Sequence, residues 1–445
     1  MTDIRSTARD HLWLHFAQVP SEDPIVIDRG EGCYVWDSDG KQYLDSLAGL
    51  FVSAIGHGRS ELATAASKQA EQMAYFPLWG MAHRPAADLA AKLADLSPGD
   101  MDRVFFTSGG SEAVESAWKL ARQYFLAKGE PDRLKVIARQ TAYHGTTFGA
   151  LSITSIEAIR APYEPLLNHM VTHVSTTNHP HGEGACALEC ADEIEEAILD
   201  QGADTVAAVF LEPLQNSGGC FEPPEGYWSR VRDICDRYGV LLVSDEVICA
   251  FGRLGAWFGG QKYDYVPDMI TFAKGVTSGY APLGGVITRP HIAQAFRDKD
   301  DIVMHGITFG GHPVSCAVAL ANIQVLESEG IIENVTANQD LFRQELETLL
   351  DLPIVSEVRG AGYFYAIELQ KDARRGIAFE QDETADIVAR LKPVLLDLGL
   401  IARADGRGAA IIQYSPPLIA GPDEFREIVR ITRESIERVS RDMCA

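Results

Sequence analysis

Several features are missing from this 445-residue sequence, and each absence excludes a class of protein. No stretch approaches roughly 18 consecutive apolar residues, so we expect no membrane-spanning helix. The first residues, MTDIRSTARDHLWLHF, lack the charged and then apolar pattern of a secretory signal, which favours a cytoplasmic location. No run of Lys or Arg offsets the balance of 39 basic against 63 acidic residues, and the net charge of −24 argues against nucleic-acid binding.

Cysteine is sparse and scattered, which argues against a metal site. The eight cysteines form no CxxC pair and stand at positions 33, 186, 190, 220, 235, 249, 316 and 444. Cys186 and Cys190 lie near His181, but no second cluster of histidine and cysteine completes a ligand set. Because single buried thiols are far commoner than such sites, we expect no bound metal.

The hydrophobic pattern changes twice along the chain. Residues 25–46 alternate apolar and polar residues around an Asp39-Gly40 turn, which predicts a small antiparallel unit, and a helix is expected around 60–75. From about residue 86, helices alternate with continuously apolar runs, which is typical of strands whose two faces are covered by helices. The helices are expected at 86–96, 112–128 and 226–238, and the strands at 104–106, 134–138, 206–211, 240–244, 268–273 and 283–287.

After about residue 325 the pattern indicates a smaller α+β unit. Helices are expected at 332–350, 384–398 and 422–442, with strands near 354–369 and 410–414. We therefore predict an α/β protein with a large domain at 61–325, built on a mostly parallel sheet flanked by helices, and a small α+β domain at 326–445. Residues 1–60 are expected to join the small domain.

The stretch TFAKGVTSGYAPLGG at 271–285 contains a lysine in an unusual position. Lys274 directly follows an apolar strand, where burial of an unpaired ammonium is costly. Burial lowers the pKa of a lysine and favours its neutral, nucleophilic form. Lys274 is therefore a candidate for Schiff-base chemistry. The alternative is a strand-terminal lysine with its ammonium in water.

Two further predicted strands end in polar groups that could bind the same ligand as Lys274. The turn Thr107-Ser108-Gly109-Gly110-Ser111-Glu112 lies between a strand and a long helix, where free N–H groups and the helix dipole bind anions. The alternative there is a tight turn with Ser111 as the N-cap. Asp245 ends the strand LLVSD, where open α/β sheets bind ligands, and a protonated pyridine nitrogen would suit it. Its alternative is an ion pair with a nearby arginine such as Arg253.

Three more polar residues follow strands of the same sheet. Tyr143 could stack on a flat cofactor ring, His144 could hydrogen-bond within the site, and Glu212 ends the strand at 206–211. The strands that end at Phe106, Ala138, Leu211, Ser244 and Ala273 thus all deliver polar groups to one edge. One shared site explains this arrangement better than five separate structural roles.

These stretches together resemble those of class III aminotransferases of the pyridoxal-phosphate-dependent fold type I family, over essentially the whole chain. The matching stretches are TSGGSEA at 107–113, YHG at 143–145, LEP at 211–213, SDEV at 244–247, FAKGVTSGYAPLGG at 272–285 and TFGGHP at 308–313. The resemblance implies that Lys274 forms a Schiff base with pyridoxal 5'-phosphate and later moves the proton. It also implies that Asp245 keeps the pyridine nitrogen protonated, and that Tyr143 and Val247 enclose the ring.

The same resemblance implies further contacts with the cofactor. The main chain at Gly110 and Ser111 would hold the phosphate, with Glu212 in a supporting position. Thr308 would reach the phosphate of the partner subunit, which implies a homodimer with shared active sites, possibly arranged as a tetramer. The enzyme would carry an amino group from an amine donor to a keto-acid acceptor by ping-pong chemistry.

The substrate assignment depends on a few positions. Relatives that act on ornithine carry glutamine three residues after the aspartate, where this chain has Ile248, as in the amine–pyruvate group. The resemblance places Phe51, Trp79 and Tyr143 in an aromatic pocket, with phenylalanine at a position that is often tryptophan and tryptophan at one that is often phenylalanine. Arg403, before the glycine-rich ADGRGAA, is favoured over Arg407 as the arginine that binds a carboxylate.

Three hypotheses follow, led by an ω-transaminase that uses pyruvate as the acceptor. The second is a diamine or 4-aminobutyrate transaminase that uses 2-oxoglutarate. The third is a non-catalytic ligand-binding protein that kept the fold. Both arginines could also be solvated loop residues without a role in substrate binding.

Overall fold

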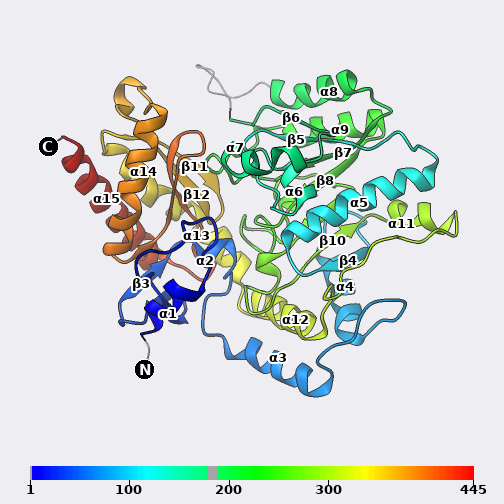
Figure 1. Cartoon of the computed structure of the whole chain (residues 1–445), viewed down its shortest axis with the longest axis horizontal. Helices are drawn as coiled ribbons and strands as arrows, with labels where there is room; N and C mark the ends of the chain where they lie inside the picture. The colour runs from blue at the N-terminus through cyan, green and yellow to red at the C-terminus, as the bar shows by residue number, and fades with distance from the viewer. Residues whose placement is uncertain (1–2, 179–187, 445) are drawn as a thin grey trace.

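The computed structural model describes residues 3–178 and 188–444 and contains three β-sheets with their covering helices (Figure 1). Of the three residues considered above for metal binding, His181 and Cys186 lie outside the described residues, and Cys190 is buried in a helix. Among residues 3–178 and 188–444, none of the helices combines the length and the hydropathy that a membrane span requires. The cytoplasmic location stays a prediction.

The largest sheet has seven strands in the order β4-β10-β9-β8-β7-β5-β6. All its strands run parallel except β10, which is antiparallel to both β9 and β4. The prediction of a mostly parallel sheet is therefore confirmed. The strands are β4 (Arg103–Thr107), β5 (Lys135–Arg139), β6 (Val171–Val174), β7 (Val206–Leu211), β8 (Leu241–Asp245), β9 (Met269–Phe272) and β10 (Gly284–Thr288).

Helices cover both faces of this sheet, which explains its continuously apolar strands. Every residue of β7, β8, β9 and β10 is buried. Along β5, Val136 and Ala138 pack into one hydrophobic cluster and Ile137 into another, as the alternation of side chains across a strand requires. The first face is covered by α5 (Gly110–Lys128), α6 (Phe148–Ile153) and α11 (Pro290–Arg297), and the second by α8 (Glu189–Gln201) and α9 (Tyr227–Tyr238).

A further layer of helices lies near the β4 end of the sheet. Helix α12 (Pro313–Ser328) packs against α3 (Ser60–Gln72) and α4 (Arg84–Leu96), and α4 contacts β4. Helix α12 was not predicted; its apolar residues are spread around the helix, so they show no one-sided pattern. The short elements are α1 (Ile4–His11), α2 (Ala48–Phe51), α7 (Glu157–Arg160), α10 (Gly259–Lys262), and the 3-10 turns η1 (Ala161–Leu166), η2 (Lys274–Val276), η3 (Thr348–Asp351) and η4 (Ala373–Arg375).

The N-terminal strands form a second sheet that includes a strand from the C-terminal part of the chain. Its order is β1 (Ile27–Glu31), β2 (Tyr34–Asp37), β3 (Gln42–Asp45) and β13 (Leu400–Ile401), with β13 parallel to β3. The predicted turn at Asp39-Gly40 joins β2 to β3, and Gly40 has a φ of 85°. This shared sheet supports the proposal that residues 1–60 belong with the C-terminal unit.

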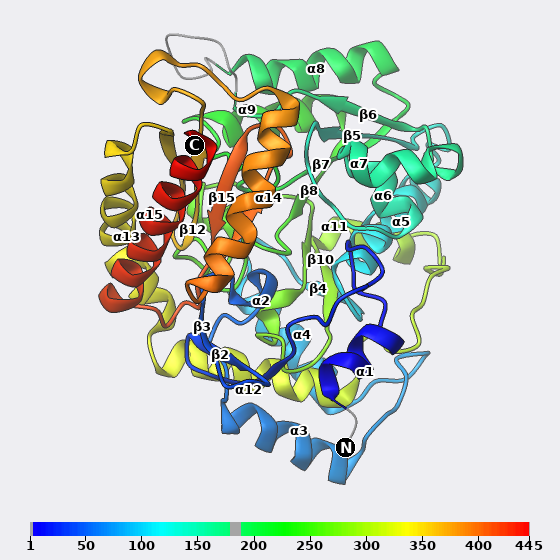
Figure 2. The same ribbon diagram turned by 60° about the vertical axis from the view of Figure 1, so that its left-hand side comes forward.

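The third sheet belongs entirely to the C-terminal part. Its order is β11 (Val355–Ala361), β12 (Phe364–Leu369), β15 (Ala410–Tyr414) and β14 (Arg403–Asp405), with every pair antiparallel. Figure 2 shows α13 (Ile331–Glu347), α14 (Gln381–Asp397) and α15 (Pro422–Cys444) packed together beside it. The strands predicted near 354–369 form a hairpin, because the chain reverses at Gly362, whose φ is 59°.

Candidate active site

Three of the polar residues predicted at one sheet edge, Glu212, Asp245 and Lys274, follow or end neighbouring parallel strands. Asp245 at the end of β8 stands in register with Thr271 of β9, and Ser244 stands beside Leu211, the residue before Glu212. Because neighbouring parallel strands end at the same edge, their terminal side chains share one volume. Lys274 follows β9 directly and completes the group.

Lys274 is half-buried among these carboxylates. Burial lowers the pKa of its amine from 10.5 to about 8, and the nearby charges of Asp245 and Glu212 offset part of that effect. Its backbone φ is 44°, a left-handed conformation that non-glycine residues avoid. The lysine is therefore not the solvated strand-terminal residue of the alternative interpretation.

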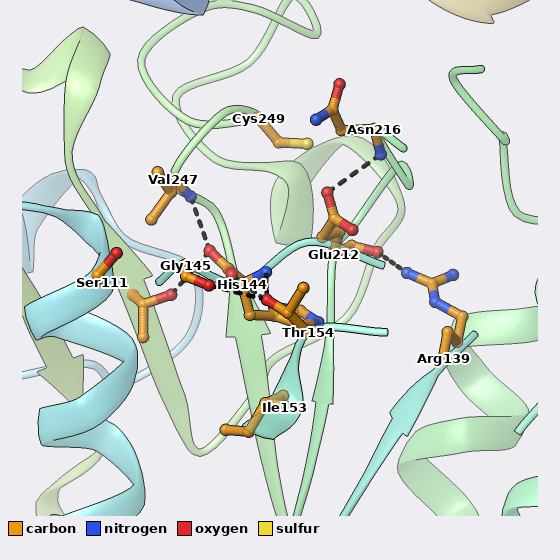
Figure 3. A network of polar contacts seen from close by, with 12 residues as sticks. Ser111, Arg139, His144, Gly145, Ile153, Thr154, Glu212, Asn216, Val247 and Cys249 are labelled. Carbon is orange, nitrogen blue, oxygen red and sulfur yellow. Dashed lines mark hydrogen bonds and ion pairs between the residues drawn. The ribbon is translucent and has the colours of Figure 1, made fainter. Parts of the chain in front are cut away.

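Asp245 is held by three hydrogen bonds, two of which the sequence did not indicate. Its Oδ2 lies 2.6 Å from His144 Nδ1, and its Oδ1 accepts hydrogen bonds from Thr271 Oγ1 at 3.0 Å and from the N–H of Val247 at 3.2 Å. His144 and Val247, two of these partners, are labelled in Figure 3. The loop that carries His144 is fixed in turn, because its N–H donates to Thr154 Oγ1 at 2.8 Å.

The alternative partner for Asp245 is wrong. Arg253 is buried and donates instead to the carbonyl oxygens of Tyr363 at 3.1 Å and Pro416 at 2.6 Å. It therefore joins the large sheet's loops to the C-terminal part of the chain. Asp245 therefore pairs with the imidazole of His144 and not with an arginine.

The turn predicted to bind an anion lies between β4 and α5, as expected, although the helix begins earlier. Helix α5 starts at Gly110, its N-cap is Gly109, and among the described residues no side chain caps it. Ser111 is thus inside the helix and is not the N-cap; its Oγ accepts a hydrogen bond from the N–H of Thr146 at 3.1 Å. A Cβ at Gly110 would lie 3.0 Å from Val247 Cγ1, so the absence of a side chain lets this turn approach the β8 loop closely.

Glu212 is a buried carboxylate near Lys274. It is buried, its Oε2 accepts a hydrogen bond from the N–H of Asn216 at 3.0 Å, and burial raises the pKa of its carboxyl. The guanidinium of Arg139 donates to the Glu212 carbonyl oxygen, as Figure 3 shows. Glu212 acts electrostatically on Lys274, and its supporting position with the cofactor stays a prediction.

Phe51 lies near both Lys274 and Arg403. The Phe51 ring centroid lies 5.8 Å from Lys274 Nζ and 5.9 Å from the Arg403 guanidinium carbon. Phe51 has a φ of 62°, and its turn is held by Asp45, whose carboxylate accepts hydrogen bonds from the N–H groups of Leu47 and Gly49. An apolar ring thus lies close to both an amine and a guanidinium.

The two arginines differ in their surroundings. Arg403 lies on β14 with 17% of its side chain exposed, pairs with Asp405 at 2.9 Å, and has its pKa lowered by burial. It is therefore not a solvated loop arginine. Arg407 pairs with the same carboxylate at 3.4 Å, and both arginines act electrostatically on Tyr143, whose pKa is raised by burial.

Trp79 and Thr308 are not brought to this group within one chain. Trp79 is 66% exposed, and a Cβ on Gly306 would lie 3.6 Å from its ring. Thr308 is exposed, and its carbonyl oxygen accepts a hydrogen bond from Tyr75 at 2.7 Å. Both residues therefore belong to one exposed region around 303–310, separate from Phe51.

The chemistry of the site fits the cofactor that the resemblance implies. A primary amine of lowered pKa suits an aldehyde, a buried carboxylate suits a pyridine nitrogen, and an uncapped helix N-terminus suits a phosphate. Thr271 was missed in the sequence. Thr271 stands opposite Asp245 on the neighbouring strand, and this pairing cannot be recognised from the sequence of one strand.

Known proteins resemble this chain along almost its whole length. A model of the class III aminotransferase family matches residues 17–436. The chain is 50% identical to a probable aminotransferase of Mycobacterium tuberculosis, over 98% of this chain and 95% of that protein. It is 36% identical to the putrescine–pyruvate aminotransferase of Pseudomonas aeruginosa, over 99% and 97%. The crystal structure of an (S)-enantioselective ω-transaminase from Thermomicrobium roseum superposes with a TM-score of 0.93 at 39% identity, covering 98% of each chain.

Proposed function

Because the chain belongs to the class III aminotransferase family, we propose that this aminotransferase passes an amino group from a primary amine or ω-amino acid to a keto acid, with pyruvate favoured. The observation that carries the proposal is the Phe51 ring, which lies within 6 Å of both Lys274 Nζ and the Arg403 guanidinium. An apolar substituent would pack on the ring, and a carboxylate would pair with the arginine. One pocket would thus accept an amine in one half-reaction and a keto acid in the other.

Pyridoxal 5'-phosphate is the cofactor that this site would hold. Lys274 would bind it covalently, the main chain at Gly110 and Ser111 would hold its phosphate, and Tyr143 and Val247 would enclose its ring. When bound, the cofactor would take up the electron pair released by the substrate carbon that bears the amino group.

The residues of the chain would control the proton that moves during the reaction. With a pKa lowered to about 8 by burial, Lys274 has an appreciable neutral fraction near neutral pH, so its Nζ can accept a proton and later return it. Asp245 would keep the ring nitrogen protonated, and its three hydrogen bonds prevent the carboxylate from rotating away. The two half-reactions would use the same lysine in turn, which gives ping-pong kinetics.

The exposed region at 303–310 supports a homodimer with shared sites. Thr308 and Trp79 lie apart from the other site residues of their own chain, and the neighbouring side chains of Met304 and Phe309 are 75% and 58% exposed. Burial of such a surface against a second copy would be favourable. In this arrangement Thr308 and Trp79 would complete the partner's pocket.

A half-reaction panel tests the substrate assignment. The cofactor-loaded enzyme is first converted by an amine donor, and the recovery of its visible absorbance is then measured with pyruvate and with 2-oxoglutarate. Faster recovery with pyruvate supports the proposal. Preference for 2-oxoglutarate, with 4-aminobutyrate or a diamine as the best donor, would establish the alternative instead.

The two arginine variants identify the carboxylate contact. In Arg403→Ala the keto-acid half-reaction should lose about tenfold or more in kcat/KM, while a donor without a carboxylate is affected within about threefold, because only the acid requires the ion pair. Arg407→Ala is the matched control, since it pairs with the same Asp405 but is not placed over Phe51. The opposite ranking of the two variants would reassign the contact to Arg407.

A further inference from the structure

The turn that carries Lys274 has a strained backbone. Lys274 and Ser278 have φ values of 44° and 50°, although neither is glycine. Each such residue costs about 1 to 2 kcal/mol, and this conformation persists only where surrounding contacts impose it. The contacts that impose it here decide where the Lys274 amine points.

One buried side chain bonds this turn at three points. Asn322 lies on α12 with no exposed surface. Its Nδ2 donates to the carbonyl oxygens of Gly275 at 2.9 Å and Val276 at 3.0 Å, and its Oδ1 accepts a hydrogen bond from Ser278 Oγ at 2.7 Å. Both N–H donors and the carbonyl of the amide are thus used.

The same hydrogen-bond network includes the loop that follows Phe51. Ser278 Oγ, which donates to Asn322, also accepts a hydrogen bond from the N–H of Ile55 at 3.3 Å. Ile55 follows Phe51 by four residues and is fully buried. Asn322 therefore connects helix α12 to the turn that carries Lys274 and, through Ser278, to the loop that follows Phe51.

We propose that Asn322 is a positioning residue, which holds the 274–278 turn so that Lys274 Nζ presents itself for covalent attachment of pyridoxal 5'-phosphate. It does not touch the reacting atoms and acts through the backbone carbonyl oxygens that follow the lysine. The proposal rests on the proposed role of Lys274 in binding the cofactor. Without Asn322 the turn would relax towards ordinary φ values, and the amine would spend less time in the reactive position.

A matched control is available on the next helix. Asn334 of α13 uses its Nδ2 in the same way, donating to the carbonyl oxygens of Leu418 at 2.8 Å and Ala420 at 3.2 Å. That loop belongs to the C-terminal part of the chain. Removal of either asparagine should lower stability, but only Asn322 should affect the lysine.

The experiment measures how fast the full-length, cofactor-free chain captures pyridoxal 5'-phosphate, followed by visible absorbance. Asn322→Ala should capture it about tenfold more slowly than the wild type, equivalent to about 1.4 kcal/mol. The pH of half-maximal capture should also rise by about half a unit, because a displaced amine gains water. Asn334→Ala should stay within about twofold of the wild-type rate.

The outcomes separate the two proposals. Capture at the wild-type rate by Asn322→Ala, or equal slowing in Asn334→Ala, would overturn the role of Asn322. If Asn322→Ala does not fold, Ser278→Ala replaces it, since alanine keeps the Cβ at the same positive φ and only the hydroxyl that donates to Asn322 is lost; slowing supports the proposal and an unchanged rate overturns it. Lys274→Ala should abolish covalent capture, and if it does not, the proposed function fails rather than the positioning role.

Discussion

In the cofactor-free chain, Lys274→Met should stabilise the fold by an amount that depends on pH. Burial lowers the pKa of Lys274 from 10.5 to about 8. Below about pH 8 the amine is protonated in both the folded and the unfolded chain, so the native state bears the full cost of burying the charge. Above 10.5 the amine is neutral in both states and this cost disappears.

The magnitude follows from the difference between these two pKa values. At about 1.4 kcal/mol for each pKa unit, the cost is about 3 kcal/mol below pH 8. Water that reaches the half-buried side chain reduces this figure, so we expect a gain of about 2 to 3 kcal/mol for methionine, which has no charge to bury. The gain should then decline steadily as the pH rises from about 8 towards 10.5.

Urea-induced unfolding at a fixed protein concentration measures this gain. The free energy of unfolding of the wild type and of Lys274→Met is compared from about pH 6.5 to about pH 10. The same substitution at the exposed Lys68 controls for the general effect of methionine. A difference between wild type and variant that does not change with pH would refute the reasoning, because it would show that burial does not penalise the Lys274 charge.

Two further predictions concern the support of the site. Thr271→Val removes the hydroxyl that donates to Asp245 at 3.0 Å, and should weaken the retention of pyridoxal 5'-phosphate in equilibrium dialysis by about tenfold, with Thr271→Ser close to wild type. Gly145→Ala should lower the free energy of unfolding by about 1 to 2 kcal/mol more than Gly408→Ala. Both glycines have positive φ, of 126° and 102°, but only at Gly145 would the new Cβ lie 2.9 Å from Ser111 Cα. Equal losses in urea unfolding would mean that strain alone, and not close packing, accounts for the effect.

Much of the site could be predicted because strand ends are a local property of the sequence. The apolar runs before Asp245, Glu212 and Lys274 identify buried strands, and parallel strands must end at a common edge. The turn at Gly110 could be predicted for the same reason, since it joins a strand to a helix. The start of that helix was misplaced by two residues because glycines carry little helix signal.

The sequence by itself determined which residue types meet at the sheet edge, and the tertiary structure decided which atoms pair there. Local patterns could not show that Asp245 would bind His144 and Thr271 rather than Arg253, which faces the C-terminal part of the chain. They also did not single out Asn322. The sequence around an asparagine in an apolar helix does not show which distant carbonyl oxygens its side chain will bind. These partners come from segments 26 to 101 residues apart, and only packing of the folded chain brings such segments into hydrogen-bond distance.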